Sequence, residues 1–405
     1  MACYSYQMVY MLVAWFKKQK RYRAKKNHRY AVVIAARNEE EVLPQLIESI
    51  RWQKYPQELI DIFVVADNCT DSTAQVCREL GACVYERQDN EKVGKGYALD
   101  FLFNKIMEEH GDKGYEAYMV FDADNIVDEN YVTEMNKVFD NGYSAVTSYR
   151  NSKNFADNWI SSGYSLWFLK EAKYMNNPRM TLNTSCAVSG TGFLVSAEII
   201  KKNNGWKYFT LTEDIEFTFD RVAAGDNIGY AENAIVYDEQ PTKLGVSITQ
   251  RSRWIKGYIQ VLGKYAGKMG KKVVLDGSFS AFDMVMNSLP SYLLTLASVI
   301  LNTVMFVFGI VTHQDMNILI YSCAMTVFNA YLFLAALGAV TAVTERKRIN
   351  ATNKQLVASV LTFPLYVGTY VFAVLVALFT DVKWKPIRHN AADSADEMKK
   401  LTKNR

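Results

Sequence analysis

The chain has 405 residues, of which 50% are hydrophobic, and a formal net charge of +4 at pH 7. This length allows one large catalytic domain with additional segments, and the small positive charge argues against nucleic acid as a partner. The chain has six cysteines with no CxxC pair, which argues against a zinc site and a disulfide framework. Long apolar stretches gather after residue 278, whereas the middle of the chain resembles a soluble domain.

Residues 1–29 combine an apolar stretch with a dense basic one. Met1 to Phe16 is apolar and aromatic, and the basic sequence KKQKRYRAKK begins at Lys17. A helix of this length covers about 24 Å, which is less than the hydrocarbon core of about 30 Å. We therefore expect a tilted anchor, an interfacial helix or part of a longer span, with its basic flank at a cytoplasmic membrane face.

From Tyr30 onward, apolar strands alternate with helices. The predicted strands are Tyr30–Ala36, Ile60–Ala66, Ala82–Glu86, Tyr118–Phe121, Ala145–Tyr149, one entered through Val188–Val195, and Ile228–Tyr237. The predicted helices include one that opens at Arg37–Glu41 and continues through Trp52, and one that starts within Asn68–Asp71. This alternation predicts an α/β fold with a mostly parallel nucleotide-binding sheet over residues 30–249.

Acidic residues follow two of these strands. Asp67 comes directly after the strand from Ile60, and Asp122 and Asp124 follow the apolar residues of the sequence YMVFDADN. The carboxyl ends of parallel strands form the edge where open α/β sheets bind ligands. Two carboxylates there suit Mg2+ or Mn2+ holding a diphosphate, although each signal alone is equally typical of a helix cap and a solvated turn.

Three further motifs lie in the same region. Lys95 lies between two glycines and can reach a phosphate, although a lone GKG is also typical of a solvated lysine. The sequence SGTG at Ser189–Gly192 is a glycine-rich turn, and Thr212–Asp214 (TED) predicts a capped helix start with acidic residues in its first turn. Each motif therefore has a structural interpretation as well as a functional one.

Residues 250–278 are predicted to form an amphipathic helix at a membrane surface. In the sequence QRSRW, Gln250, Arg253 and Trp254 share one turn. Arg253 can therefore meet a pyrophosphate, and Trp254 can offer a flat ring to a sugar. The alternative for Trp254 is a simple interfacial anchor.

Residues 279–379 contain three apolar stretches, each long enough to span a membrane: Leu289–Val311, Ile318–Val343 and Gln355–Phe379. The loop after the first stretch has no Lys or Arg, whereas the loop after the second is basic, so the first loop is expected outside and the second inside. Basic residues in the tail, 380–405, favour a cytoplasmic tail as well. Pro364 allows the third stretch to be a kinked interfacial or re-entrant segment.

The motifs Asp67, DAD, TED and QRSRW occur in one order on one predicted domain. In this order the chain resembles the membrane-bound, inverting family 2 glycosyltransferases, which include cellulose, hyaluronan and chitin synthases. The resemblance runs from about Tyr30 to Tyr265, and the series is far more specific than any single motif. It implies a GT-A type domain, a UDP-sugar donor, and an integral plasma membrane enzyme with a cytoplasmic catalytic domain.

The resemblance also implies roles for individual residues. Asp214 is the expected base, because an inverting transfer needs a carboxylate to take the proton of the acceptor hydroxyl. The expected nucleotide-sugar ligands are Asp67, Lys95, Asp122, Asp124 and Arg253, with Asp122 and Asp124 also holding Mg2+ or Mn2+. The expected acceptor-side residues are Gly190, Thr191, Gly192, Glu213 and Trp254, and Gln250 belongs to the same motif set.

The tail sequence VKWKPIRH, Val382 to His389, has two interpretations. It resembles the gating loop that closes over nucleotide in cellulose and hyaluronan synthases, with Trp384 as its aromatic residue. The alternative is a juxtamembrane anchor that places Trp384 at the interface and its cations on anionic lipid.

The sequence thus predicts transfer of a sugar, with inversion, from a UDP-sugar to a growing β-linked polysaccharide. One alternative is a non-processive transferase that adds a single sugar to a lipid. A second, less favoured, is a sugar-nucleotide-binding export partner without turnover. Membrane lipids are expected partners and nucleic acid is not, while a homo-oligomer, the sugar and the linkage are left open.

Overall fold

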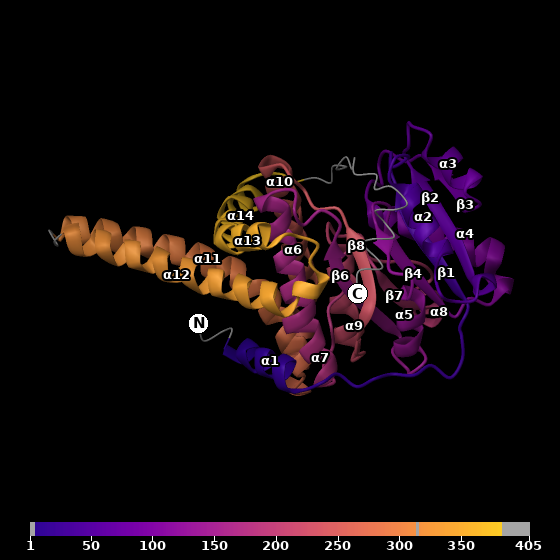
Figure 1. Cartoon of the computed structure of the whole chain (residues 1–405), viewed down its shortest axis with the longest axis horizontal. Helices are drawn as coiled ribbons and strands as arrows, with labels where there is room; N and C mark the ends of the chain where they lie inside the picture. The colour runs from indigo at the N-terminus through magenta and orange to yellow at the C-terminus, as the bar shows by residue number, and fades with distance from the viewer. Residues whose placement is uncertain (1–4, 313–315, 383–405) are drawn as a thin grey trace.

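The computed structural model describes residues 5–312 and 316–382. A sheet with helices on both faces forms one end of the molecule, and the long helices α11 (Phe279–Val311) and α12 (Met316–Thr344) project from the other as a hairpin (Figure 1). The strands are β1 Tyr30–Ala36, β2 Ile60–Asp67, β3 Cys83–Arg87, β4 Ala117–Asp122, β5 Ile126–Val127, β6 Ala145–Ser152, β7 Phe193–Ser196 and β8 Gly229–Asp238.

These strands form one eight-stranded sheet in the order β3-β2-β1-β4-β7-β6-β8-β5. The first four are parallel, β7 is antiparallel to both β4 and β6, β8 is parallel to β6, and β5 is antiparallel to β8. The predicted, mostly parallel α/β sheet is confirmed. The carboxyl ends of β1, β2, β4, β6 and β8 consequently lie at the same edge.

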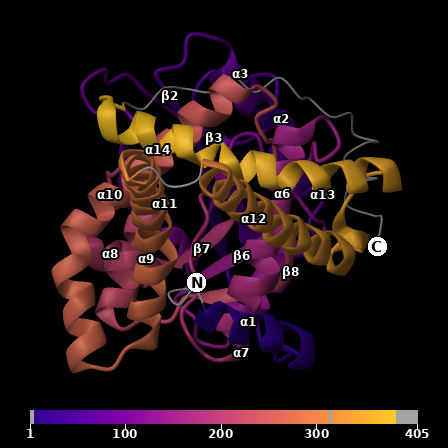
Figure 2. The same ribbon diagram turned by 90° about the vertical axis from the view of Figure 1, so that its left-hand side faces the viewer.

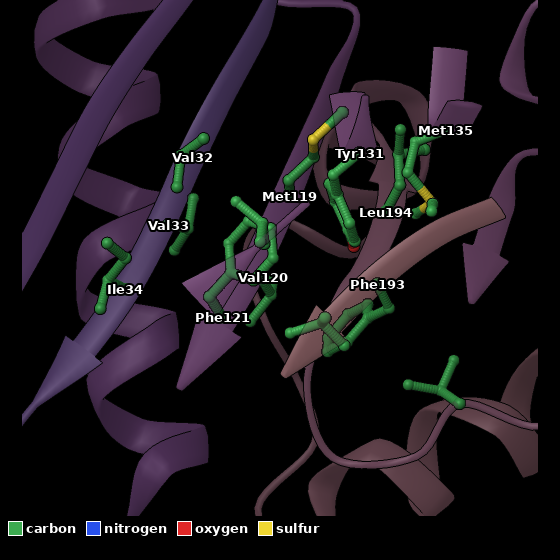
Figure 3. Close-up of a cluster of buried hydrophobic side chains, with 14 of the residues drawn as sticks. Val32, Val33, Ile34, Met119, Val120, Phe121, Tyr131, Met135, Phe193 and Leu194 are labelled. Atoms are coloured by element: carbon green, nitrogen blue, oxygen red, sulfur yellow. The ribbon is translucent and has the colours of Figure 1, made fainter. Parts of the chain in front are cut away.

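The central strands are continuous apolar runs because their side chains are buried on both faces of the sheet. β1 is buried along almost its whole length, because helices cover both faces of the sheet. Figure 3 shows one part of this core, where side chains of three strands pack with α5 (Tyr131–Phe139): Val32, Val33, Ile34, Met119, Val120, Phe121, Phe193, Leu194, Tyr131 and Met135. The sheet edge is therefore held on a rigid base.

The other helices of this domain are α2 Leu43–Arg51, α3 Thr73–Glu79, α4 Lys95–His110, α6 Trp159–Glu171, α7 Asn177–Thr181, α8 Ala197–Asn203 and α9 Glu213–Ala224. The predicted helix starts at Arg37–Glu41 and Asn68–Asp71 are wrong. Asn38 and Asn68 adopt φ of 57° and 53°, which a right-handed helix excludes. The Asn38 amide instead binds Thr70, with the Thr70 N–H donating to Asn38 Oδ1 at 2.8 Å.

The remaining helices are α1 Ser5–Phe16, α10 Leu244–Leu275, α13 Asn353–Gly368 and α14 Tyr370–Phe379. Within the described residues, two segments are long and apolar enough to cross a membrane, judged by length and composition: Met316–Thr344 and Asn353–Phe379. Ile300–Val311, at the end of α11, is apolar but shorter. The amphipathic helix predicted from Gln250 begins earlier, at Leu244.

The third apolar stretch is divided into α13 and α14 at Thr369, with Pro364 inside α13. α13 packs against α6 and α12, and α14 packs against α10. In Figure 2 the α11–α12 hairpin points toward the viewer, and α13 and α14 run across its axis. This crosswise arrangement is the geometry that an interfacial segment would have.

A buried ion pair joins the base of the hairpin to the α/β domain. Asp283 of α11 accepts from Arg179 Nε of α7 at 2.7 Å, and neither side chain is exposed. The hydroxyls of Tyr10 and Tyr6 of α1 donate to the same carboxylate at 2.8 Å and 2.9 Å. Because the buried charges are paired and hydrogen-bonded, this cluster fixes α1, α7 and α11 together.

Candidate active site

A cavity of about 2100 Å3 opens at the carboxyl edge of the sheet. Its lining includes Asp67, Asp122 and Asp214 from the sheet side, and residues of α6, α10, α12 and α14 farther along. The position agrees with the general rule that open α/β sheets bind ligands outside the carboxyl ends of their strands. The cavity thus brings motifs that are distant in sequence to one place.

Asp67, the last residue of β2, pairs with Arg87, the last residue of the neighbouring strand β3. The distance from Arg87 Nη1 to Asp67 Oδ1 is 2.5 Å, and Asn68 Nδ2 donates to the same oxygen at 3.2 Å. Burial raises the pKa of Asp67, although Arg87 partly opposes this effect. The carboxylate is therefore fixed within the sheet edge and is not a helix cap.

Lys95, at the start of α4, lies at the centre of the polar groups. Its ammonium is 2.5 Å from Asp122 Oδ1 and donates to the carbonyl of Gly190 at 2.8 Å. Glu213 Oε1 is 3.5 Å away. Burial lowers the pKa of Lys95, but the attraction of Asp122 and Glu213 outweighs burial and raises it. Lys95 is therefore a charged, partnered lysine at the sheet edge.

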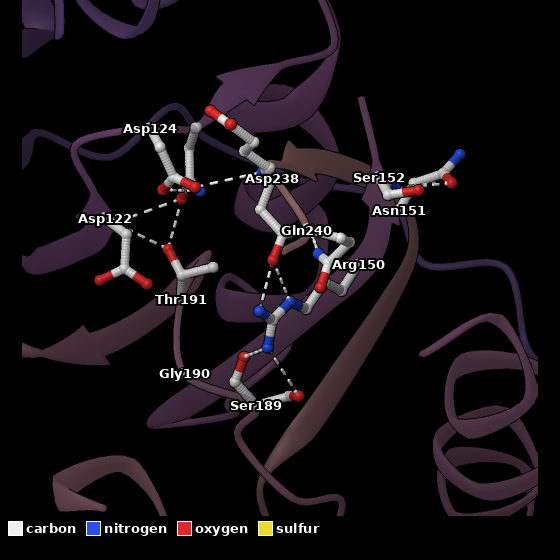
Figure 4. A network of polar contacts seen from close by, with 12 residues as sticks. Asp122, Asp124, Arg150, Asn151, Ser152, Ser189, Gly190, Thr191, Asp238 and Gln240 are labelled. Carbon is white, nitrogen blue, oxygen red and sulfur yellow. Dashed lines mark hydrogen bonds and ion pairs between the residues drawn. The ribbon is translucent and has the colours of Figure 1, made fainter. Parts of the chain in front are cut away.

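Asp122 and Asp124 have different surroundings. The Asp122 side chain is 37% exposed, and its backbone N–H donates to Thr191 Oγ1 at 2.8 Å. Asp124 is buried, and its carboxylate accepts from the backbone N–H of Glu239 at 3.1 Å and from Asn125 Nδ2 at 3.2 Å (Figure 4). Asp122 is thus the more accessible carboxylate of the pair.

The sequence did not identify the adjacent pair of Arg150, on β6, and Asp238, the last residue of β8. Arg150 Nε donates to Asp238 Oδ2 at 2.7 Å, and Nη1 donates to the Ser189 carbonyl at 3.0 Å (Figure 4). Burial raises the pKa of Asp238 to about 6, against the effect of Arg150. Both residues line the cavity. Each directly follows a predicted strand, and that position is the signal that could have revealed them.

The turn Ser189–Gly192 connects the two ends of the site. The Gly190 N–H donates to Asp214 Oδ2 at 2.6 Å. Gly192 has φ of 62°, and a Cβ there would lie 2.7 Å from both Ser148 Oγ and Val236 Cγ1, so glycine is required. Thr191 is buried and uses its hydroxyl for the Asp122 N–H and Asn125. The turn reaches the cavity through Ser189 and Gly190.

Glu213 and Asp214 form the first turn of α9, directly beside Lys95. Burial raises the pKa of Glu213 to about 7, and Lys95 opposes this while the charge of Asp214 adds to it. Burial likewise raises the pKa of Asp214, with Lys95 again opposing. A carboxylate with a raised pKa is a stronger proton acceptor, which is a property that a residue acting as a base needs.

Gln250, Arg253 and Trp254 of the QRSRW sequence lie on α10 and line the same cavity. Gln250 Oε1 and Arg253 Nε are buried and have no hydrogen-bond partner among the described residues. Burial lowers the pKa of Arg253. The Trp254 ring meets the Tyr164 ring edge-on, with centroids 5.8 Å apart. Unsatisfied buried polar atoms cost about 1–3 kcal/mol each, so a polar ligand that pairs with them would bind favourably here.

The chemistry of the donor set fits a divalent ion held jointly with a nucleotide. Among residues 5–312 and 316–382, no group of three or more His, Cys, Asp or Glu side chains is arranged to hold a metal ion. Asp122 and Asp124 offer two hard oxygen donors, and Mg2+ commonly takes one or two carboxylates, with phosphate oxygens and water completing its octahedron. Trp384 and the rest of the predicted gating segment after Val382 lie outside the described residues.

Comparison with known proteins identifies the family. The family described as Glycosyltransferase like family 2 matches residues 28–257, more than half of the chain. The chain is 24% identical over 379 residues to the "Probable glycosyltransferase YdaM" of Bacillus subtilis, covering 87% of this chain and 83% of that protein. It is 24% identical over 281 residues to the beta-monoglucosyldiacylglycerol synthase of Nostoc sp., covering 66% of this chain and 57% of the synthase.

A solved structure shares the fold. The mannosyltransferase PcManGT of Pyrobaculum calidifontis, in complex with GDP-Man and Mn2+, superposes with a TM-score of 0.58 at 14% identity, covering 93% of this chain and 96% of that one. The predicted GT-A type fold is confirmed, and the family 2 part of the resemblance inferred from the motif series is confirmed as well. The chain is a member of glycosyltransferase family 2.

Proposed function

We propose that the chain transfers a sugar from a UDP-sugar to a hydroxyl group of a membrane lipid, with inversion at the anomeric carbon. The observation that carries this proposal is the continuity of the cavity. Asp122 and Asp214 line it at the sheet edge, and Leu334 and Leu337 of α12 and Val371 of α14 line it at the other end. A lipid with its hydroxyl at Asp214 can therefore lay its apolar chains against these helices.

The exposed surface of the hairpin supports a membrane setting. Large apolar side chains more than half exposed occur along both α11 and α12: Val304, Phe308, Ile318 and Phe333. An apolar surface of this extent is unfavourable in water and suits a hydrocarbon environment. We therefore place the hairpin in the bilayer and the catalytic domain on the cytoplasmic side, where the basic segments Lys17–Lys26 and Arg346–Arg348 agree with the positive-inside rule.

The relatives favour the lipid acceptor. The Nostoc relative is named for a glycolipid product, a monoglucosyldiacylglycerol. Transfer to a growing β-linked polysaccharide, the first expectation from the sequence, remains a prediction. A lipid and a polysaccharide acceptor differ in what would occupy the apolar end of the cavity. The acyl chains of a lipid match the apolar residues that line this end.

The proposed base is Asp214. The Gly190 N–H fixes Asp214 Oδ2, which leaves the carboxylate oriented toward the cavity that it lines. The acceptor hydroxyl would give its proton to Asp214 while its oxygen attacks the anomeric carbon and the bond to the diphosphate breaks. Glu213 and Trp254 line the same cavity and are proposed to position the acceptor.

The departing UDP is proposed to be stabilised by cations on both sides of the cavity. Lys95 reaches in from α4 and Arg253 from α10, and Arg253 still has an unpaired donor. Asp67 is proposed to bind the nucleoside, and Asp122 and Asp124 to hold Mg2+ or Mn2+, which supplies charge neutralisation at the diphosphate when bound. Thr191 and Gly192 would then support this arrangement from behind the cavity wall.

The test is UDP release by the purified full chain in lipid nanodiscs, with a panel of UDP-sugars and with dioleoylglycerol present or absent. We expect dioleoylglycerol to stimulate UDP release and to yield a product carrying one sugar, identified by mass spectrometry. Asp214→Asn should lower the rate on the order of 100-fold to 10,000-fold while UDP binding survives. EDTA should abolish transfer, and Mg2+ or Mn2+ should restore it.

Two results would contradict the proposal. Release of UDP that no lipid stimulates, together with a glycan sensitive to linkage-specific glycanases, would establish polysaccharide synthesis instead. Equal loss of UDP binding and turnover in Asp214→Asn would show that Asp214 binds the nucleotide and that the base lies elsewhere.

A further inference from the structure

One face of α6 lines the cavity between the sheet edge and the hairpin. The cavity-lining residues of this face are Trp167, Phe168, Lys170 and Glu171, and Tyr174 and Met175 of the π-helical turn that follows α6 also line the cavity. The charged residues on this otherwise apolar face are Lys170 and Glu171. Neither belongs to the motifs of the catalytic end.

These two side chains are partly buried and carry opposite charges that attract each other. Within the described residues, no hydrogen bond or ion pair reaches the Glu171 carboxylate, and the Lys170 ammonium has an aromatic contact, 5.2 Å from the centroid of the Trp167 ring. Burial raises the pKa of Glu171 and lowers the pKa of Lys170. Both side chains are partly buried and line the cavity, so a polar ligand in the cavity can reach them.

The backbone is also irregular at this point. Ala172–Asn176, directly after Glu171, forms a π-helical turn before α7. Pro178 lacks the N–H that would bond back to residue 174, and the wider turn accommodates that loss. Turns of this kind occur frequently at functional sites, and here the turn sets the direction in which Tyr174 and Met175 face the cavity.

Phe168 connects this face to the catalytic end. The guanidinium of Arg150 lies 3.8 Å from the centroid of the Phe168 ring. Glu171 is about one helical turn beyond Phe168 and lines the same cavity. A group bound at Glu171 would therefore lie about one helical turn from the Phe168 ring that Arg150 contacts.

We propose that Lys170 and Glu171 form the headgroup subsite for a neutral, hydroxyl-bearing acceptor lipid. The inference rests on the proposed function and adds to it the class of headgroup. A hydroxyl group donates to a carboxylate and accepts from an ammonium, so a headgroup with hydroxyls satisfies both residues. A phosphodiester satisfies Lys170 alone and is repelled by Glu171, which disfavours anionic lipids.

The test compares three acceptors in nanodiscs: dioleoylglycerol, its monoglucosyl derivative and dioleoylphosphatidylglycerol. Wild type should prefer the two neutral lipids. Glu171→Gln and Lys170→Met should each raise the KM for the monoglucosyl lipid about 10-fold, as expected for the loss of a hydrogen bond to a charged group. The KM for the UDP-sugar should stay unchanged, and Glu108→Gln, an exposed change on α4, should match wild type.

A reciprocal shift separates recognition from a merely structural role. Glu171→Gln should lower the KM for dioleoylphosphatidylglycerol, because the repelling charge is gone, whereas a damaged fold would weaken all three acceptors. Unchanged acceptor KM in both variants, or a wild type that prefers the anionic lipid, would overturn the subsite while leaving lipid transfer standing. A wild type that uses none of the lipids would overturn the proposed function itself, and the subsite with it.

Discussion

At the sheet-edge end of the cavity, atoms of one turn, at Gly190 and Thr191, hold several of the candidate site residues in place. The Gly190 N–H holds the carboxylate of Asp214, and the Gly190 carbonyl accepts from Lys95, which also pairs with Asp122. The backbone of Asp122 in turn bonds to Thr191, the next residue of the turn. The proposed base and the proposed diphosphate site are therefore positioned by the same few residues, and a shift at one reaches the other.

Glu213 provides a test of this electrostatic arrangement. Its pKa in the folded chain is raised from 4.5 to about 7. A carboxyl group with a raised pKa favours the folded state while it is protonated, and that contribution is lost as the pH rises from about 4.5 through 7. The free energy of unfolding of Glu213→Gln should therefore equal that of wild type at pH 4.5 and exceed it increasingly as the pH rises. The difference should reach on the order of 1–3 kcal/mol at pH 8.

Thermal unfolding of both proteins in the same detergent, from pH 4.5 to pH 8, measures this difference. Glu108→Gln is the matched control, because the Glu108 side chain is 66% exposed and its replacement should shift the midpoint little at any pH. A Glu213→Gln variant that is less stable than wild type at pH 8 would show that the ion pair with Lys95 outweighs burial.

Most strands could be predicted from the sequence, but their ends could not, and this decided which site residues were found. Asp67 and Asp122 follow apolar runs that end abruptly. Arg150 and Asp238 were missed because β6 and β8 continue one to three residues beyond the apolar run that revealed them. The start of α2 was misplaced because Asn38 adopts a left-handed conformation that cross-links two loops, an interaction between distant parts of the chain.

The antiparallel direction of β7 also could not be predicted from the local sequence pattern. Alternating strands and helices predict parallel neighbours, yet β7 is antiparallel to β4 and β6. β7 has only four residues, too few for their pattern to indicate the direction of the strand. Its position depends on the tight turn at Gly190 and Gly192. That turn also delivers the Gly190 N–H to Asp214, so the strand that was hardest to predict helps to build the site.

The contact between α6 and α13 depends on one glycine. A Cβ at Gly163 would lie 2.7 Å from Cβ of Tyr366 and closer still to its ring, so α13 could not stay in place. Gly163→Ala should lower the free energy of unfolding by about 1–3 kcal/mol, measured as a lower midpoint of thermal unfolding. It should also reduce sugar transfer, because α6 and α13 both line the cavity. Gly245→Ala in α10 is the control, since nothing lies within 4 Å of the added atom.

The control should be neutral or slightly stabilising, because alanine favours a helix more than glycine does. A Gly163→Ala variant as stable and as active as Gly245→Ala would show that α13 does not need its close approach to α6.

The proposed placement of the chain in a membrane rests on the hairpin and on the segment that crosses its axis. α11 and α12 project away from the sheet, whereas α13 and α14 lie across the hairpin axis against α6 and α10 (Figures 1 and 2). We expect the hairpin to cross the bilayer and α13–α14 to lie at its cytoplasmic face. The segment Asn353–Phe379 would then begin and end on the cytoplasmic side.

Cysteine labelling tests this arrangement in intact cells, in a Cys323→Ser background that removes an exposed thiol from α12. An impermeant maleimide should label Thr312→Cys from outside and should not label Asn353→Cys or Asp381→Cys. All three should react after the membrane is permeabilised, which controls for accessibility. External labelling of Asp381→Cys would show that Asn353–Phe379 crosses completely.

The single cavity that reaches from the sheet edge to the hairpin also determines how the proposed reaction depends on its two substrates. A UDP-sugar is dissolved in water and arrives in three dimensions, so its occupancy follows bulk concentration. A lipid arrives by lateral diffusion in a plane, and its occupancy follows its mole fraction in the bilayer. Diluting the acceptor with inert lipid should therefore slow the enzyme even when the total amount of acceptor is constant. Adding buffer should change the rate only because it lowers the concentration of the UDP-sugar. The activity of the molecule would in this way depend on the composition of the membrane that contains it.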